Sequence, residues 1–383
     1  MLNFTKPLPL SLYIHIPWCV KKCPYCDFNS HAAPQSLPEQ LYIAALLQEL
    51  ESHLPLIQDR PITSIFFGGG TPSLFSAHAI EQILKGVEKL TPFASDIEIT
   101  LEANPGTIDE SHFHGFRTAG INRLSIGIQS LQNDKLKTLG RIHDADNAMR
   151  AVKIAKESGF DNFNIDIMYG LPQQSLADAL YDINTALSLE PTHFSWYQLT
   201  LEPNTLFHHQ PPTLPSDDLI WDMQIAGQAR LAEAGFQQYE VSAYAKPNKQ
   251  CRHNLNYWQF GDYLGIGAGA HSKMTNLLTN EVLRFAQVKN PRDYLVAEKR
   301  LAWQPQVITQ DALAFEFMLN ALRLTEGVEA GLFAERTGLP LSDIAVISKN
   351  AIKKGLLMDD AKRICPTPLG KKFLDNLTAL FLV

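Results

Sequence analysis

Residues 13–28 read YIHIPWCVKKCPYCDF, and the three cysteines of this stretch, Cys19, Cys23 and Cys26, have the spacing C-x3-C-x2-C. Three thiolates can hold three corners of a [4Fe–4S] cube, which leaves the fourth iron open to a small molecule. A structural zinc site would need a fourth ligand nearby, and His15 and His31 keep that alternative open. A disulfide framework would need an even number of cysteines. The spacing therefore favours an iron–sulfur cluster over zinc.

The composition is that of a globular protein with a substantial core. The chain has 383 residues, of which 45% are hydrophobic, and a net charge of -7. This length predicts two domains, or one large barrel with an appendage. The negative charge argues against a general nucleic-acid partner, because no broad basic surface is available to neutralise phosphates. Five cysteines, three of them clustered, are typical of a reducing compartment. Neither a signal peptide nor a long apolar stretch is evident, so we expect a cytoplasmic protein.

Short apolar strands alternate with longer amphipathic helices through the first two thirds of the chain. Successive β-α units of this length close into, or curl toward, a parallel barrel whose chemistry lies at the carboxyl ends of the strands. The predicted fold class is therefore α/β, a partial parallel (β/α)6 TIM-like barrel. An open doubly wound sheet is the alternative, because strand order cannot be read from sequence. The predicted strands are 12–16, 62–67, 96–102, 123–129, 164–168 and 193–200, and the clearest predicted helices are 38–53, 148–158 and 217–234.

The last third of the chain has a different pattern. A short strand is predicted at 237–242, and an irregular loop follows it. A helix-rich segment then resembles a winged helix. Its predicted helices are 312–324, 330–337, 341–355 and 369–380, with a hairpin-like piece at 356–366. We therefore expect a core at 1–236, a connecting segment at 237–305 and a mostly helical, winged-helix-like domain at 306–383. Because acidic residues interrupt its lysines, we interpret this last domain as a cover or docking domain.

Several motifs beyond the cysteine stretch mark the ends of the predicted strands. Tyr25 stands just before the third cysteine, and GGGTP at 68–72 follows the second strand. The other motifs are EANP at 102–105, RLSIGIQS at 123–130, LGR at 139–141, NID at 164–166, YGLP at 169–172 and HNLNYW at 253–258. Together they resemble the radical S-adenosylmethionine (SAM) superfamily, and within it the HemN/HemW branch. The resemblance covers nearly the whole chain, extends to the HemN-type C-terminal domain, and is closest to the heme chaperones of that branch.

The resemblance implies two cofactors and the residues that bind them. Cys19, Cys23 and Cys26 would hold a [4Fe–4S] cluster, with one iron left for exchangeable SAM. The residues implied in SAM binding are Tyr13, Tyr25, Gly69, Gly70, Thr71, Glu102, Gln129, Arg141 and Asp166. Taken singly, each polar residue has an ordinary structural explanation, such as capping a helix. Their common place at or just beyond strand ends favours a shared site.

The resemblance also implies a function. It predicts a heme chaperone that binds heme and transfers it to acceptor hemoproteins, including membrane-associated ones. The alternative is the oxygen-independent coproporphyrinogen III oxidase of the same branch, a radical SAM enzyme. Two departures place the oxidase second: Phe28 stands where the oxidase has a further cysteine, and only twelve residues precede Tyr13. The resemblance therefore implies a radical SAM fold without this dehydrogenase activity, and catalytic residues are left unassigned.

His253 is the candidate heme ligand, because heme iron commonly takes an axial imidazole. Tyr257 and Trp258 follow it closely and have the flat rings that stack on a porphyrin face. The alternative is a loop histidine bonded to backbone, with Trp258 plugging the barrel. Cys251 and His271 are further candidate ligands, although a buried cysteine is more often inert. The sequence names no acceptor and leaves a homodimer open.

Overall fold

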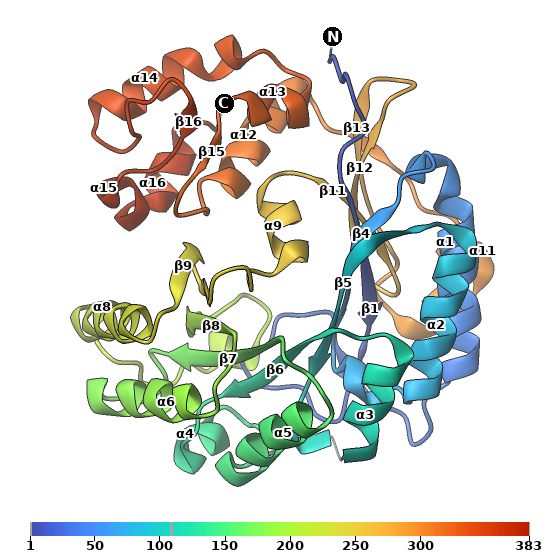
Figure 1. Ribbon diagram of the computed structural model, residues 1–383, viewed down its shortest axis with the longest axis vertical. Helices are drawn as coiled ribbons and strands as arrows, with labels where there is room; N and C mark the ends of the chain where they lie inside the picture. Colours follow the sequence, from blue (N-terminus) through green and yellow to red (C-terminus); the bar gives the residue numbers. More distant parts are fainter. Residues whose placement is uncertain (1, 108–109, 383) are drawn as a thin grey trace.

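One curved sheet of twelve strands forms the centre of the molecule (Figure 1). The structure, a computed structural model, describes residues 2–107 and 110–382. The strand order is β14-β13-β12-β11-β1-β4-β5-β6-β7-β8-β10-β9. The central strands run parallel, and antiparallel strands extend the sheet on both sides. Because β14 and β9 lie at opposite ends of this order, the strands form an open, partial barrel.

The six strands predicted in the first two thirds of the chain all form, and they pair in parallel in chain order. Helices cover the outer face of these strands (Figure 1). The strands are β1 (Leu10–Ile16), β4 (Ile62–Gly69), β5 (Phe93–Ala103), β6 (Arg123–Gln129), β7 (Phe163–Tyr169) and β8 (His193–Gln198). The helices are α1 (Glu39–Ile57), α2 (Ala77–Leu90), α3 (Glu110–Ala119), α4 (Asn133–Thr138), α5 (Ala145–Glu157), α6 (Leu176–Ser188) and α8 (Asp217–Glu233).

Local sequence signals fix where several of these helices begin. Ser76 caps α2, since its hydroxyl accepts a hydrogen bond from the backbone N–H of Ala79 at 3.1 Å. Asp144 and Ser175 form capping boxes at the starts of α5 and α6. Such caps satisfy N–H groups that the first helical turn leaves without a partner. The starts of these three helices, α2, α5 and α6, are thereby fixed.

Residues 237–305 supply strands to both ends of the sheet. At one end they continue β8 in antiparallel fashion, which confirms the strand predicted at 237–242. At the other end β11 pairs in parallel with β1, and this strand was not predicted. Antiparallel strands follow β11 outward. These strands are β9 (Gln237–Glu240), β10 (Ala243–Ala245), β11 (Asp262–Ile266), β12 (His271–Asn276), β13 (Glu281–Ala286) and, just beyond, β14 (Gln306–Val307).

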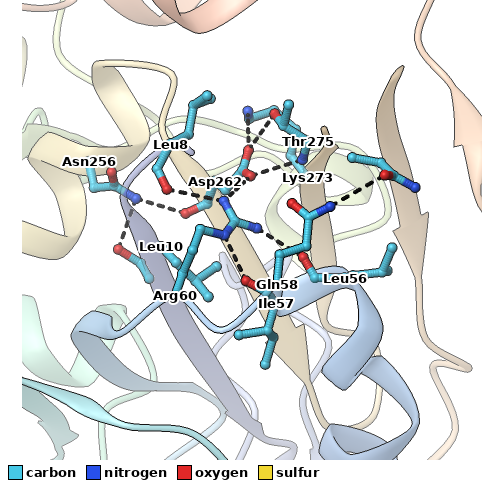
Figure 2. A network of polar contacts seen from close by, with 12 residues as sticks. Leu8, Leu10, Leu56, Ile57, Gln58, Arg60, Asn256, Asp262, Lys273 and Thr275 are labelled. Atoms are coloured by element: carbon cyan, nitrogen blue, oxygen red, sulfur yellow. Dashed lines mark hydrogen bonds and ion pairs between the residues drawn. The ribbon is translucent and has the colours of Figure 1, made fainter. Parts of the chain in front are cut away.

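A buried polar network ties β11 to its neighbours (Figure 2). The carboxylate of Asp262 accepts hydrogen bonds from Arg60 Nη1 (2.7 Å), Lys273 Nζ (3.0 Å), and the backbone N–H and hydroxyl of Thr275 (both 2.9 Å). Asn256, in the HNLNYW motif, donates to the backbone oxygen of Asp262 at 2.9 Å. The side chains of Asp262, Arg60 and Lys273 are almost completely buried. The network joins α1, β11, β12 and α9 (Arg252–Trp258) at the end of the sheet away from the cysteines.

The C-terminal region is built around a second apolar core, which α12, α13, α14 and α16 share with Leu2, Phe260 and Val282. The prediction of its final helix is wrong in one respect: two helices, α15 and α16, meet at Phe373, where one continuous helix was expected. The predicted hairpin at 356–366 is reduced to a single bridge between Leu357 and Pro366. The elements are α12 (Gln310–Ala321), β15 (Val328–Glu329), α13 (Gly331–Thr337), η3 (Leu341–Ile344), α14 (Ala345–Lys353), β16 (Arg363–Ile364), α15 (Pro368–Lys372) and α16 (Leu374–Ala379).

Helix α9 connects the two parts of the molecule. Its Leu255 and Trp258 pack against the C-terminal core, and the guanidinium of Arg323 lies 4.3 Å from a ring centroid of Trp258. Short elements complete the described chain: β2 (Trp18–Cys19), β3 (His31–Ala32), η1 (Pro72–Leu74), η2 (Pro105–Thr107), α7 (Leu206–His209), α10 (Pro291–Tyr294) and α11 (Ala297–Arg300). Among the described residues, no helix has the length and apolar character needed to cross a membrane.

Candidate functional site

A cavity of ≈ 950 Å³ lies inside the partial barrel, and it brings the predicted site residues together. The cysteine loop, the glycine motif and the inner faces of the parallel strands line this cavity. Its lining includes all the residues implied in cluster and SAM binding and the candidate heme ligand His253: Tyr13, Cys19, Cys23, Tyr25, Cys26, Gly69, Gly70, Thr71, Glu102, Gln129, Arg141, Asp166 and His253. The structure therefore places around one space residues that are up to 240 positions apart in sequence.

The three clustered cysteines are free thiols, and all three are partly exposed. Two polar groups approach them: the hydroxyl of Thr71 donates to Cys19 Sγ at 3.4 Å, and Arg141 Nη1 donates to Cys23 Sγ at 3.7 Å. Burial raises the pKa of Cys19 and Cys26, and hydrogen bonds from Thr71 and the backbone of Phe28 lower them in part. Donors that point at the sulfurs suit thiolates bound to a metal cluster.

Neither histidine near the cysteine loop faces the thiols. His15 uses both ring nitrogens in hydrogen bonds, with Tyr13 OH at 3.0 Å and the carbonyl of Asn29 at 2.9 Å. His31 Nε2 is hydrogen-bonded to the carbonyl of Lys289 at 3.2 Å, and neither imidazole lines the cavity. In residues 2–107 and 110–382, no set of three His, Cys, Asp or Glu side chains is arranged to hold a single metal ion.

The glycine motif packs against the strand that leads into the cysteine loop. Gly69 has a φ of 112°, and a Cβ atom there would lie 2.5 Å from the ring of His15. A Cβ atom at Gly70 would lie 2.5 Å from the backbone oxygen of Trp18. Only glycine permits this conformation and this approach without a shift of the backbone. The motif thus fixes the cysteine loop directly, besides leaving room for a ligand.

Two buried carboxyls share the cavity wall. Burial and the nearby charge of Asp166 raise the pKa of Glu102 to about 8, and a hydrogen bond from the Gly69 backbone offsets part of this rise. Burial also raises the pKa of Asp166, although Asn164 Nδ2 (2.7 Å) and the Ser125 hydroxyl (3.3 Å) donate to its carboxylate. At neutral pH this pair carries less negative charge than two solvated carboxylates would. Two carboxyls with raised pKa values in one cavity are typical of a functional site.

Gln129 adopts an unusual backbone conformation at the end of β6. Its φ is 76°, and the pairing of β6 with β7 shifts register between Gly127 and Gln129. A non-glycine residue in this region costs about 1 kcal/mol or more, and such strain is often found at ligand sites. Tyr197 OH donates to Gln129 Oε1 at 2.6 Å, and Arg141 Nη2 donates to the Gly127 carbonyl at 2.6 Å. These contacts hold the amide and the guanidinium at the cavity wall.

The inner face of β6 also carries residues that the sequence motifs did not indicate as ligands. Because side chains alternate along a strand, the pattern that turns Gln129 inward also turns Gly127, Ser125 and Arg123 inward. Arg123 is only 2% exposed. His193, Ser195 and Tyr197 of β8 line the cavity in the same alternating way. One signal in the sequence could have identified Arg123. It is the alternation of inward and outward side chains along β6, counted back from Gln129.

Two histidines line the cavity, and their hydrogen bonds distinguish them. His193 uses both ring nitrogens, with Asn164 Oδ1 at 2.6 Å and Tyr239 OH at 2.8 Å. His253 uses Nδ1 with the Ser64 hydroxyl at 3.3 Å, and among the described residues its Nε2 has no hydrogen bond. Burial, and then the charge of Arg123, lower the pKa of His253 to about 3. At neutral pH its imidazole is therefore uncharged, and in the tautomer with the proton on Nδ1 the lone pair of Nε2 is available to a ligand.

The two further candidate ligands lie outside this arrangement. Cys251 is completely buried, and burial raises its pKa to about 12, as expected of an inert thiol. Its Sγ lies 3.6 Å from Glu98 Oε1 and does not line the cavity. His271 lines a different, smaller cavity beside β13. His253 is therefore the predicted ligand that the fold places with the cysteines.

Comparisons with known proteins identify the family. The model of the radical SAM superfamily matches residues 13–185, and that of the HemN C-terminal domain matches residues 308–373. The heme chaperone HemW of Haemophilus influenzae is 51% identical over 378 residues, which cover 98% of each chain. The chain belongs to the HemW family. HemW of Escherichia coli is 50% identical over 374 residues, again 98% of each chain.

The structural comparison agrees that this HemW-family chain has the fold of a radical SAM protein. Coproporphyrinogen III oxidase (HemN) from Escherichia coli, a radical SAM enzyme, has a TM-score of 0.82 with this chain at 25% sequence identity. The match covers 98% of this chain and 91% of that chain. The predicted fold class and the predicted family are both confirmed. The HemW and HemN proteins thus share this fold, and the higher identity is to HemW.

Proposed function

We propose that this protein is a heme chaperone that binds heme in the barrel cavity and transfers it to acceptor hemoproteins. The observation that carries the proposal is the meeting of the three cysteines and His253 in one cavity of a HemW-family chain. The relatives that share about half of its residues over their full length are heme chaperones by name. Acceptor hemoproteins, including ones at a membrane surface, are part of this proposal, and so is a homodimer.

Cys19, Cys23 and Cys26 would hold a [4Fe–4S] cluster at the carboxyl end of the barrel. The donor set fits this group, because the thiols are free and partly exposed, and Thr71 and Arg141 donate to their sulfurs. When bound, the cluster would offer one open iron to the amino and carboxylate groups of SAM. The zinc alternative receives no support from His15 or His31, because their Nε2 atoms are hydrogen-bonded to the carbonyls of Asn29 and Lys289 and neither residue lines the cavity.

The residues proposed for SAM surround the same end of the cavity. Glu102, Gln129 and Asp166 offer carboxyl and amide groups for a ribose and an amino group. Arg141 is held by the Gly127 carbonyl and offers a guanidinium for a carboxylate. Their partners within the protein fix these groups in place before any ligand arrives. The site is thus preorganised for a small polar molecule beside the cysteines.

His253 is the proposed axial ligand of heme. Its Nε2 lacks a hydrogen bond within the described chain, and its low pKa leaves the imidazole neutral. A neutral imidazole nitrogen is a common ligand of heme iron. The aromatic rings of Phe66 and Tyr13 lie 5.1 and 6.4 Å from the His253 ring. Such rings suit a porphyrin face.

The oxidase function is not favoured. The chain is about twice as similar to the chaperones as to the solved oxidase, at 50% against 25% identity. Phe28 occupies the place where the oxidase would have a further cysteine, and its side chain is 59% exposed at the rim of the cavity. No thiol therefore stands at that position.

Heme titration of the anaerobically purified protein tests the proposal. We expect saturable binding with a shifted Soret band, and a weaker or spectrally altered complex for His253→Ala. His271→Ala is the matched control, because His271 lies in another cavity and its loss should leave the spectrum unchanged. Absence of saturable heme binding would refute the chaperone function. An unchanged His253→Ala spectrum would refute His253 as the ligand only.

Iron and sulfide analysis of the same preparation tests the cofactor part of the proposal separately. We expect both elements in the wild type and their loss in Cys19→Ser, whereas Cys365→Ser should retain them because Cys365 lies in the C-terminal region. Anaerobic incubation with SAM, reductant and coproporphyrinogen III should yield no protoporphyrinogen. Formation of that product would favour the oxidase.

A further inference from the structure

Arg123 is a buried cation that has no hydrogen-bonding partner among the residues that the structure describes. It is one of the largest fully buried side chains, at 2% exposure, and it lines the barrel cavity. Its Nε–H has no hydrogen bond, and its two Nη groups form no hydrogen bond or ion pair within residues 2–107 and 110–382. A guanidinium carries five N–H donors in a rigid fork. The interior of the protein thus contains an unusually large set of unused donors.

Two carboxylates, Glu98 and Asp166, act electrostatically on Arg123, and within the described residues neither forms an ion pair with it. Glu98 Oε1 accepts the backbone N–H of Arg252 at 2.9 Å and that of His253 at 3.3 Å, and it lies 3.6 Å from Cys251 Sγ. Glu98 thereby anchors the start of α9 and forms no ion pair with Arg123 in the described chain. Burying an unpaired charge is costly, and proteins normally pair such a group or place it against a ligand.

The position of Arg123 separates it from the cysteine end of the cavity. It is the first residue of β6, and Gln129 is the last. Six residues of extended strand span about 20 Å, so Arg123 lies deep in the barrel, near its other end. His253 belongs to this deep end as well, because Nδ1 is bonded to Ser64 near the start of β4. The charge of Arg123 lowers the pKa of both His253 and His193.

We propose that Arg123 binds a carboxylate of the porphyrin cargo, a propionate side chain, while His253 holds the iron. This subsite rests on the proposed heme-binding function. A planar fork of N–H donors matches a carboxylate in two parallel hydrogen bonds. The carboxylate of SAM has its own proposed partner in Arg141, which stands at the cysteine end with Nη1 3.7 Å from Cys23 Sγ, so Arg123 is left for another carboxylate. The otherwise unpaired guanidinium therefore sets both the depth and the orientation of the porphyrin.

The test compares hemin with hemin dimethyl ester, in which both propionates lack charge. Cluster-loaded, anaerobic protein is titrated with each, and affinity is measured from the Soret band. Wild type should bind hemin about 10- to 100-fold more tightly than the ester, the range expected for a charge-assisted pair. Arg123→Gln should bind hemin about as weakly as wild type binds the ester, and should no longer distinguish the two ligands.

Two further variants keep the test decisive. Arg252→Gln is the matched control, since Arg252 adjoins His253 but forms an ion pair with Asp96 at 3.1 Å, and it should retain the preference for hemin. Arg123→Lys keeps the charge without the fork and should lose part of the preference; it replaces Arg123→Gln if that variant does not fold. Equal wild-type affinity for hemin and ester, or a preference that survives in Arg123→Gln, would overturn the subsite. Absence of saturable hemin binding would overturn the proposed function, and the subsite with it.

Discussion

Replacing Asp262 by Asn should strongly destabilise the sheet. The Asp262 carboxylate accepts four hydrogen bonds, two of them from the cations of Arg60 and Lys273 (Figure 2). Asn is nearly the same size but neutral, so the variant would leave two buried cations without a counter-charge. Breaking a buried ion pair by removing one partner costs about 3–5 kcal/mol. We expect a loss of unfolding free energy in this range, because both cations are at least 94% buried.

Lys273→Met gives the comparison that separates charge from packing. This variant leaves Asp262 with Arg60 and with both donors of Thr275, and it keeps an unbranched side chain against Phe260. It should therefore cost less than Asp262→Asn. In the Asp262→Asn background the sign should change: removing Lys273 relieves repulsion between two cations and should restore part of the lost stability.

Urea-induced unfolding at neutral pH, followed by circular dichroism, measures these differences. Glu190→Gln serves as the surface control, because its ion pair with Lys156 is largely exposed and should be worth no more than about 1 kcal/mol. A cost below about 1 kcal/mol for Asp262→Asn would refute the reasoning. The reasoning would also be refuted if Lys273→Met destabilised the Asp262→Asn variant as much as it destabilises the wild type.

Three further changes test other parts of the structure. Gly70→Ala should lower the iron and sulfide content per chain severalfold, because its Cβ would lie 2.5 Å from the Trp18 carbonyl oxygen; unchanged content would contradict this packing. Tyr197→Phe, which removes the 2.6 Å hydrogen bond to Gln129, should weaken SAM binding about 2- to 10-fold in equilibrium dialysis at unchanged iron content. Burial raises the pKa of Asp182 to about 6, from an ordinary 3.8. Its contribution to unfolding free energy is therefore complete below pH 3.8 and lost as the pH rises through 6. Relative to wild type, Asp182→Asn should gain up to about 3 kcal/mol between about pH 4 and 7 in urea unfolding, and a pH-independent difference would contradict this pKa.

The sequence by itself determined the parallel part of the barrel and the elements that line it. The strands β1, β4, β5, β6, β7 and β8 each have a buried apolar face and end in a polar or glycine-rich motif, so short-range patterns suffice to locate them. The cysteine spacing predicted the cluster site, which no comparison tests directly. The motifs at the strand ends predicted that their residues would share one space, and these residues all line the cavity.

Local patterns were less informative where pairing is non-local. β11 is a five-residue strand that pairs in parallel with β1, about 250 residues earlier in the chain. Nothing in residues 262–266 specifies that neighbour. The pairing depends on Asp262 meeting Arg60 from the α1–β4 connection, and on Asn256 reaching back to the β11 backbone. The break at Phe373 was missed for a similar reason, since packing decides whether two helical stretches join.

Only the tertiary structure decided the surroundings on which the proposed roles of Arg123 and His253 rest. Alternation along β6 places Arg123 inward, but the sequence cannot show that Glu98 Oε1 binds the start of α9 and that Arg123 has no ion pair within the described residues. Likewise, His193 and His253 look alike in sequence, and only the hydrogen bonds of their ring nitrogens distinguish them. The physical reason is that periodicity reports which face of an element is buried. The groups that meet there come from distant segments, so their charges and hydrogen bonds are set only when the chain folds.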